Sequence, residues 1–350
     1  MKRVVVLAIL GCILSFSSFS QQTYRNLVLE GGGVRGFAYA GAMQVLDSLG
    51  ILQQIERVGG TSAGAIQATM LAIGYTPAEI AAITSKVPLK TFNDGSLTGG
   101  LSRMQRKFGF YKGEKLQTWI ENLILEKTGD ANISFIQLHQ QKSEKGYKDL
   151  YITGTDLSYR CLRVFSYETY PSMRIKDALR ISFSIPLYFQ PVLINDQGEI
   201  LADRTDTAAH LMVDGGLLSN YPIHLFDNGK YTDCPGGEMH CYNMETLGLL
   251  LEKPNQLSYR IGSEAPLQIN TLNEYFSAVY KTLIDRPNPD EPGLNRTITI
   301  SDLGLSGRVR KLPQATINRL IESGKEGVRK FFNSSSPNGN VSADTLHVQR

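Results

Sequence analysis

The chain has 350 residues, of which 42% are hydrophobic and 20% are charged, and its formal net charge is +3. This length and composition are typical of a globular protein with one large α/β domain or two smaller ones. So small a net charge gives no indication of nucleic-acid binding, and we expect no nucleic-acid partner.

The first 20 residues have the pattern of a secretory signal peptide. Two basic residues precede an apolar stretch at 4–16, and Ser18-Phe19-Ser20 places small residues at the cleavage positions. We therefore expect cleavage after Ser20 and export of residues 21–350 to the periplasm, a membrane or the exterior. A lipoprotein signal at Cys12 is the less favoured alternative, and an uncleaved anchor would need a longer apolar stretch.

A glycine-rich loop joins the first expected strand, at 26–30, to the first expected helix, at 37–49. Its sequence is Gly31-Gly32-Gly33-Val34-Arg35-Gly36. The N–H groups of Gly31, Gly32 and Gly33 can point towards one position, as an oxyanion hole requires. Arg35 would orient the loop or add positive potential, and a surface arginine on the first helical turn is the alternative.

The same loop also matches the dinucleotide-binding pattern Gly-x-Gly-x-x-Gly through Gly31, Gly33 and Gly36. Such a site needs an acidic residue at the end of the second strand to bind the ribose. The second expected strand, at 55–58, instead continues into Gly59-Gly60-Thr61-Ser62. A dinucleotide-binding oxidoreductase is therefore the weaker interpretation.

Gly60-Thr61-Ser62-Ala63-Gly64 lies between this second strand and a helix expected at 65–72. Strand, tight turn and helix are the context of a nucleophile elbow, in which the serine has a strained backbone at the positive end of a helix dipole. Gly60 and Gly64 suit this turn because a Cβ atom at either position would collide with a neighbouring strand or helix. Ser62 is therefore a candidate nucleophile, and an ordinary strand-to-helix turn is the alternative.

Residues 86–115 differ in composition from the rest of the chain. They contain seven basic residues against Asp94 and Glu114, with aromatic residues and glycines between them. The basic residues are Lys86, Lys90, Arg103, Arg106, Lys107, Lys112 and Lys115. Basic and aromatic side chains together suit contact with an anionic lipid surface, and a mobile insertion here would act as a lid. The other interpretation, which we favour, is a solvated, flexible loop.

The remaining elements complete an α/β pattern. We expect helices at 75–85, 114–128, 175–184, 267–283 and 316–332, strands at 150–156, 161–166, 211–213, 246–251 and 297–300, and a hairpin at 192–201. This alternation predicts a largely parallel sheet sandwiched by helices. The polar tail at 334–350 is expected to be disordered. Cys234 and Cys241 can form a disulfide, or these two and Cys161 are free thiols.

The glycine loop, followed roughly 30 residues later by Gly60–Gly64, resembles the patatin-like phospholipase family. The resemblance extends to Asp214-Gly215-Gly216 with the six residues after it, and to Ile181–Pro191 before it. It covers residues 26–225 of a domain expected at 21–333, whose part from 226 onwards would be supporting structure. The resemblance implies that Ser62 and Asp214 form a catalytic dyad, supported by Arg35, Gly36, Gly60, Gly64, Gly215 and Gly216.

Ser62 needs a base because a free hydroxyl group is a weak nucleophile. His210 and His224 flank Asp214 in the sequence, so a triad with histidine is not excluded, but we expect both to be structural or surface residues. The glycine loop, Ser62 and Asp214 each follow an expected strand. Sites in parallel sheets lie at the carboxyl ends of the strands, so these groups are expected to converge.

The resemblance therefore implies an exported serine acyl hydrolase that acts on phospholipids, lysophospholipids or other acyl esters. No cofactor and no metal are implied, and the sequence contains neither a calcium-binding loop nor an HExxH motif. A catalytically weak protein of the same fold that binds lipid is the alternative function.

Overall fold

A computed structural model describes residues 22–203, 209–234, 241–253, 269–270, 275, 278–279, 282, 291–305, 307 and 310–334. The expected signal peptide, most of the expected helix at 267–283 and the tail beyond Ser334 lie outside the described residues.

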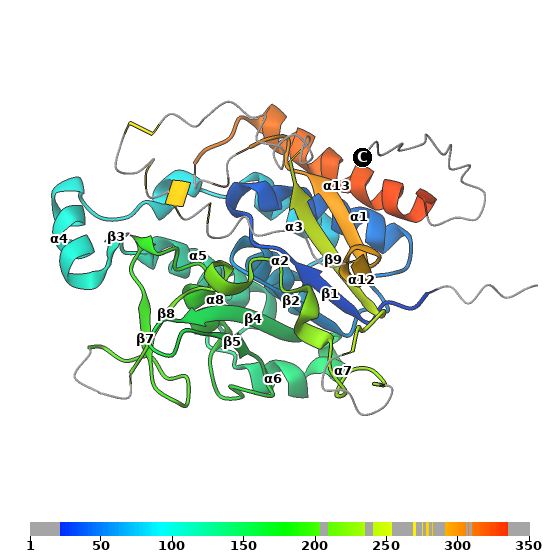
Figure 1. The fold of residues 1–350 in the computed structure, drawn as a ribbon, viewed down its shortest axis with the longest axis horizontal. Helices are drawn as coiled ribbons and strands as arrows, with labels where there is room; N and C mark the ends of the chain where they lie inside the picture. Colours follow the sequence, from blue (N-terminus) through cyan, green and yellow to red (C-terminus); the bar gives the residue numbers. More distant parts are fainter. Residues whose placement is uncertain are drawn as a thin grey trace, which may run out of the picture.

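Most strands of the described chain belong to one eight-stranded sheet (Figure 1). Its order is β10–β9–β1–β2–β4–β8–β7, and β5 also pairs with β4, while β3 and β6 form a separate pair. The strands are β1 (Asn26–Leu29), β2 (Arg57–Gly60), β3 (Gly109–Tyr111), β4 (Asp149–Asp156), β5 (Cys161–Phe165), β6 (Leu187–Phe189), β7 (Val192–Ile194), β8 (His210–Asp214), β9 (Thr246–Glu252) and β10 (Thr297–Ser301). The pairs from β10 to β4 are parallel, and β5, β7 and β8 add antiparallel pairs. The predicted largely parallel sheet is confirmed.

The helices differ widely in length. They are α1 (Ala38–Ser48), α2 (Ala63–Ala72), α3 (Pro77–Ser85), α4 (Leu97–Lys107), α5 (Glu114–Thr128), α6 (Phe135–Gln140), α7 (Lys142–Lys145), α8 (Ile175–Ser182), α9 (Gly216–Ser219), α12 (Glu291–Leu294) and α13 (Gln314–Ser334), with short 3-10 helices η1 (Gly33–Phe37), η2 (Leu89–Phe92) and η3 (Ile223–Phe226). The expected hairpin at 192–201 is present as β7, an antiparallel bridge between Ile194 and Ile200 and a hydrogen bond of 2.9 Å from the Leu201 N–H to the Leu193 carbonyl oxygen, and β7 also pairs with β8.

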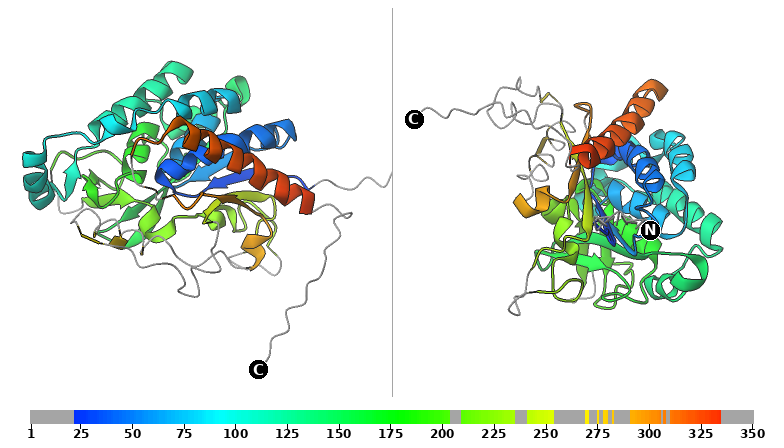
Figure 2. Two further views of the ribbon diagram at one scale, coloured as in Figure 1. Left: turned by 90° about the horizontal axis from the view of Figure 1, so that it is seen from above. Right: turned by 90° about the vertical axis from the view of Figure 1, so that its right-hand side faces the viewer.

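The two faces of the sheet are covered differently. Because side chains alternate along a strand, Leu27 and Leu29 point into the large core formed with α1, α2 and α8, whereas Val28 faces the other way. Figure 2 shows α13 beside α1 on the same side of the sheet. On the opposite face, Val28 and Tyr151 pack against Phe226 of η3. Long helices therefore cover one face, and short helices of the segment after Asp214 cover part of the other.

The basic insertion at 86–115 contains η2, α4 and β3, which corrects the expectation of a loose loop. Ser96 Oγ caps α4 by accepting a hydrogen bond of 3.1 Å from the Gly99 N–H. Arg103 Nε donates to the Phe110 carbonyl oxygen at 3.0 Å and so holds β3 beside α4. These contacts satisfy backbone groups that a flexible loop would leave to water. In Figure 1, α4 projects from one end of the molecule.

The C-terminal part of the chain completes the sheet. β9 lies between β10 and β1, and α13 packs against both α1 and β10. Cys234 and Cys241 are bonded to each other as a disulfide, and Cys161 is a free thiol. Among the described residues, none of the helices combines the length and the hydropathy that a membrane span requires.

Candidate active site

Ser62 occupies a strained turn between β2 and α2. Its φ of 53° and ψ of −120° lie outside the regions that non-glycine residues normally adopt, as the elbow motif predicted. The close approach of the flanking glycines is also confirmed. A Cβ atom on Gly60 would lie 2.7 Å from the Gly64 carbonyl carbon, and one on Gly64 would lie 2.5 Å from the Leu29 carbonyl oxygen. The turn therefore holds Ser62, half-buried, at the N-terminal end of α2.

A hydrogen bond from α8 fixes the backbone of Ser62. Its N–H donates to the hydroxyl group of Ser182, the last residue of α8, at 2.9 Å. Ser182 itself is fully buried. Because the Ser62 amide is engaged in this way, it fixes the backbone of Ser62 and is not available as an oxyanion donor in this conformation.

Ser62 and Asp214 converge because β2 and β8 run towards each other along one edge of β4. Gly60 of β2 pairs with Ile152, and Asp214 of β8 pairs with Gly154, only two residues further along β4. The strand β5 pairs with the same stretch of β4 and therefore occupies its other edge. This corrects the expectation that Asp214 ends a parallel strand, because β8 is antiparallel to β4. The carboxyl ends of β2 and β8 therefore face each other across two residues of β4, a spacing of about 7 Å along that strand.

The carboxyl group of Asp214 is fully buried at the end of β8. Its Oδ1 accepts a hydrogen bond of 2.7 Å from the Gly216 N–H, and its own N–H donates to the Ser184 carbonyl oxygen at 3.0 Å. A Cβ atom on Gly215 would lie 2.3 Å from Thr153 Oγ1, so the turn packs closely on β4. Thr153 and Thr61 share a hydrogen bond of 2.6 Å between their hydroxyl groups, which ties the Asp214 turn to the Ser62 turn.

The glycine loop lies against Ser62. A Cβ atom on Gly31 would be 3.4 Å from Ser62 Cβ. However, the Gly31 N–H donates to the Asn220 carbonyl oxygen at 2.9 Å, so it is not available as an oxyanion donor in this conformation. This finding narrows the expected oxyanion hole to Gly32 and Gly33. Gly33 has a φ of +54°, a conformation that glycine adopts without strain.

Asn220 clamps the glycine loop to the segment that follows Asp214. Its Nδ2 donates to the Gly31 carbonyl oxygen at 3.0 Å and to Glu30 Oε1 at 2.8 Å. The other carboxylate oxygen of Glu30 accepts the Leu251 N–H at 2.8 Å. Since Glu30 is buried, these bonds hold the ends of β1 and β9 and the loop in one network.

Arg35 is buried, which removes the alternative of a surface arginine. Its Nε donates to the Gly32 carbonyl oxygen at 3.2 Å, and its Nη1 pairs with Asp302 Oδ2 at 2.9 Å. Arg35 therefore orients the glycine loop and links it to the end of β10. Next to it, a Cβ atom on Gly36 would lie 3.3 Å from Ala63 Cβ, so η1 and the start of α2 pack closely.

The two histidines near Asp214 in the sequence serve other contacts. His210 begins β8, and its ring nitrogens contact Asp156 Oδ2 at 2.7 Å and Asp196 Oδ1 at 2.8 Å. Nδ1 of the half-exposed His224 contacts Asp227 Oδ2 at 2.6 Å. The prediction that both are structural or surface residues is confirmed. His240 and His347 lie outside the described residues.

Three residues of this site were not found by reasoning from the sequence alone. Ser182 lies within Ile181–Pro191, which carried the family resemblance, but the resemblance gave its side chain no role. Asp302 follows no motif and is 267 positions away from its partner Arg35. Asn220 lies in the segment after Asp214 that carried the family resemblance, but its spacing alone gave no role to its side chain.

Residues 27–227, more than half of the chain, match the family model of patatin-like phospholipases. The chain belongs to the patatin-like phospholipase family. This assignment removes the dinucleotide interpretation of the glycine loop. It also agrees with the observed fold and with the order of the glycine loop, Gly60–Gly64 and Asp214-Gly215-Gly216 along the chain.

Two curated relatives of this patatin-like chain come from viruses. An uncharacterized protein of Acanthamoeba polyphaga mimivirus, R571, is 36% identical over 60% of this chain and 63% of its own length. The "Probable lipid hydrolase 463L" of Invertebrate iridescent virus 6 is 30% identical over 59% of this chain and 65% of its own length. The chain thus spans less than two thirds of the length of these two relatives.

A solved structure gives the same result for the fold. VipD from Legionella pneumophila superimposes with a TM-score of 0.59 over 89% of this chain and 67% of its own chain, at 15% sequence identity. At this level of identity the likeness concerns the fold alone.

Proposed function

We propose that this patatin-like protein hydrolyses acyl esters of lipids, with Ser62 as nucleophile and Asp214 as the base that accepts its proton. The observation that carries the proposal is the meeting of a strained Ser62 turn and a buried Asp214 at one edge of β4. Membership in the patatin-like phospholipase family and the name of the iridescent-virus relative support lipid as the substrate class.

In the proposed reaction, Ser62 Oγ attacks the ester carbonyl carbon while Asp214 takes the hydroxyl proton. The aspartate then returns this proton to the leaving alcohol, which gives an acyl-enzyme. A water molecule, activated by the same carboxylate, releases the acid and restores Ser62. The fixed backbone of Ser62, bonded to Ser182, supports this step because the nucleophile needs no rearrangement.

The negative charge that develops on the carbonyl oxygen would be stabilised by the amides of Gly32 and Gly33. One such donor is typically worth about 3–4 kcal/mol of barrier reduction. Arg35 and Asn220 hold the loop from its two sides. The N-terminal end of α2 adds the positive end of its dipole beneath Ser62.

Contact with a lipid surface is proposed for α4. Leu101 is 62% exposed on this projecting helix, and the basic residues Arg106 and Lys107 lie in its last turn. An apolar side chain beside basic residues suits the boundary of an anionic membrane, and export through the N-terminal signal would bring the chain to such a surface. Leu101→Asp should weaken binding to anionic vesicles while hydrolysis of a short soluble ester persists. Unchanged vesicle binding would contradict the contact.

The proposed activity is tested with residues 21–350, the Ser62→Ala variant and the exposed control Ser48→Ala. Hydrolysis of p-nitrophenyl butyrate and of phosphatidylcholine vesicles is followed in the presence of EDTA. We expect the wild-type chain and the control to be active and Ser62→Ala to be inactive. Equal activity of the folded Ser62→Ala variant would contradict the proposal, and the absence of activity in all three folded proteins would favour a lipid-binding function.

A further inference from the structure

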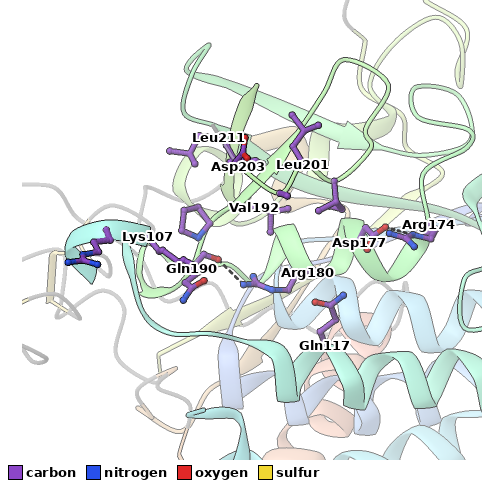
Figure 3. A pocket seen from close by; sticks show the side chains of 15 residues that line it. Lys107, Gln117, Arg174, Asp177, Arg180, Gln190, Val192, Leu201, Asp203 and Leu211 are labelled. Atoms are coloured by element: carbon purple, nitrogen blue, oxygen red, sulfur yellow. Dashed lines mark hydrogen bonds and ion pairs between the residues drawn. The ribbon is translucent and has the colours of Figure 1, made fainter. Parts of the chain in front are cut away.

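A cavity lies beside α8. Its volume is about 490 Å³, within the range of small-molecule sites, and neither Ser62 nor Asp214 lines it. Arg180 and Gln190 lie on one side of it, Val192, Leu201 and Leu211 on the other, and Lys107 at its edge (Figure 3). The cavity therefore combines apolar side chains with a guanidinium group, and the carboxylate side chains of Asp177 and Asp203 also line it.

Arg180 is a buried cation whose hydrogen bonds all go to neutral oxygens. Its side chain is only 8% exposed, and it donates to the carbonyl oxygens of Lys112 and Gln190, each at 2.8 Å, and to the Ser184 hydroxyl group. None of the carboxylates in the described part of the chain forms an ion pair with it. Burial lowers the pKa of Arg180 to about 10, because it outweighs the attraction of Asp94 and Glu114, which raises the pKa.

An unpaired buried charge is costly, and proteins normally pair such a charge or give it a ligand. A guanidinium group has five N–H donors, and the three contacts of Arg180 leave two of them. The remaining donors, one on Nε and one on Nη1, do not share an edge of the guanidinium group, so one of them, together with the positive charge, would bind one carboxylate oxygen. Arg106 and Lys107 also line the cavity, whereas Arg174 is already paired with Asp177 at 2.5 Å.

We propose that this cavity binds a single-chain carboxylate amphiphile, with the carboxylate on Arg180 and the chain along Val192, Leu201 and Leu211. The ligand class follows from the two halves of the lining, since a free inorganic anion would leave the apolar wall in contact with water. The inference does not depend on the proposed hydrolysis, although acyl ester hydrolysis releases an acid of this class.

The bound ligand would lie next to groups that position the proposed active site. Arg180 donates to the Ser184 hydroxyl group, and the Ser184 carbonyl oxygen accepts the Asp214 N–H at 3.0 Å. The same helix ends at Ser182, which accepts the Ser62 N–H. The helix α8 and its C-terminal turn therefore contact the cavity through Arg180 and the proposed dyad through Ser182 and Ser184.

The test is isothermal titration calorimetry with the folded Ser62→Ala chain, so that turnover plays no part. Dodecanoate, below its micelle concentration, is compared with acetate, dodecanol and inorganic phosphate. We expect dodecanoate to bind and acetate to bind at least about a hundredfold more weakly, because acetate lacks the buried chain. Absence of dodecanoate binding, or equal affinity for dodecanoate and for acetate or phosphate, would overturn the proposal.

Two variants in the Ser62→Ala background locate the binding. Arg180→Met should weaken dodecanoate binding about ten- to a hundredfold through loss of the charged hydrogen bond. Leu201→Asp leaves Arg180 in place but puts a charged carboxylate where the apolar chain of the ligand would lie. It should therefore weaken dodecanoate binding to a similar extent, and it tests the proposal even if Arg180→Met does not fold. The control Leu157→Asp makes the same change at a side chain 39% exposed and outside the cavity. Unchanged affinity in folded Leu201→Asp would overturn the proposal.

Discussion

The carbonyl oxygen of Asn220 accepts the N–H of Gly31 at 2.9 Å, while Asn220 Nδ2 donates to the carbonyl oxygen of Gly31 at 3.0 Å. This pair of bonds joins the glycine loop to the segment that begins with Asp214. The glycine loop and Asp214 are therefore held together through one covalent segment, residues 214–220, and a change at Asn220 should affect their relative position.

Asn220→Ala removes the side-chain bonds to Gly31 and Glu30 but leaves the backbone bond. We expect kcat for p-nitrophenyl butyrate to fall about ten- to a hundredfold with little change in KM, because the loop position matters most in the transition state. The free energy of unfolding should fall by about 1–3 kcal/mol, the usual effect of leaving a buried polar group unpaired. The exposed control Asn132→Ala should change neither quantity. Loss of stability with unchanged kcat would make the clamp purely structural.

Gly32 and Gly33 should respond differently to replacement by alanine. A Cβ atom on Gly32 would lie 2.3 Å from Leu251 Cδ1, the flexible end of a side chain, whereas one on Gly33 would lie 1.8 Å from the Gly307 carbonyl oxygen at a φ of +54°. We expect Gly32→Ala to fold but to acylate about tenfold more slowly or worse, because its amide is displaced. Gly33→Ala should lose about 2–4 kcal/mol of stability.

Rapid-mixing acylation rates and urea unfolding separate the two effects. A Gly32→Ala chain that acylates at the wild-type rate would remove this amide from the oxyanion hole. A Gly33→Ala chain as stable as the wild type would contradict the close packing of Gly33 on Gly307.

Stability should depend on pH through His210. Burial alone would lower the pKa of His210, but its hydrogen bonds to Asp196 and Asp156 outweigh burial and raise it, with a smaller opposing effect from Arg163. A raised pKa in the folded state means that the stabilisation is complete below the unfolded-state value, about 6.5, and is lost as the pH rises through the folded-state value.

Urea unfolding midpoints between pH 5.5 and 9 measure this effect. The wild-type chain should lose stability at the upper end of the range relative to His210→Asn, which has no titrating imidazole there. Asp196→Asn removes one of the two carboxylates and should shift the decline to lower pH. Parallel stability curves for the wild type and His210→Asn would contradict the charged pairing.

The local motifs of the site could be predicted from the sequence because they depend on neighbouring residues. The strained Ser62 turn follows from its flanking glycines, and the strand before Asp214 follows from its apolar residues. The direction of β8 could not be predicted, because an apolar strand reads the same whether its neighbour is parallel or antiparallel. The pairing of Arg35 with Asp302 depends on the tertiary fold, since the sequence gives no signal across that separation.

The structure of the basic insertion at 86–115 could not be predicted from the sequence either. Its basic composition suggested a loop, but order at 86–115 comes from single side chains such as Ser96 and Arg103 that satisfy nearby backbone groups. Composition averages over such contacts. Whether this segment moves as a lid stays a prediction.

If Asp214 activates Ser62 as a nucleophile, the rate at which a fluorophosphonate labels the chain should depend on Asp214. Intact-mass and peptide mass spectrometry would follow the wild type and Asp214→Asn, a variant that keeps an oxygen for the Gly216 N–H. We expect labelling at Ser62 in the wild type and a rate at least about a hundredfold lower in Asp214→Asn, with the same melting temperature. No label on Ser62 of the folded wild type, or equal rates in the two proteins, would contradict the activation of Ser62 by Asp214.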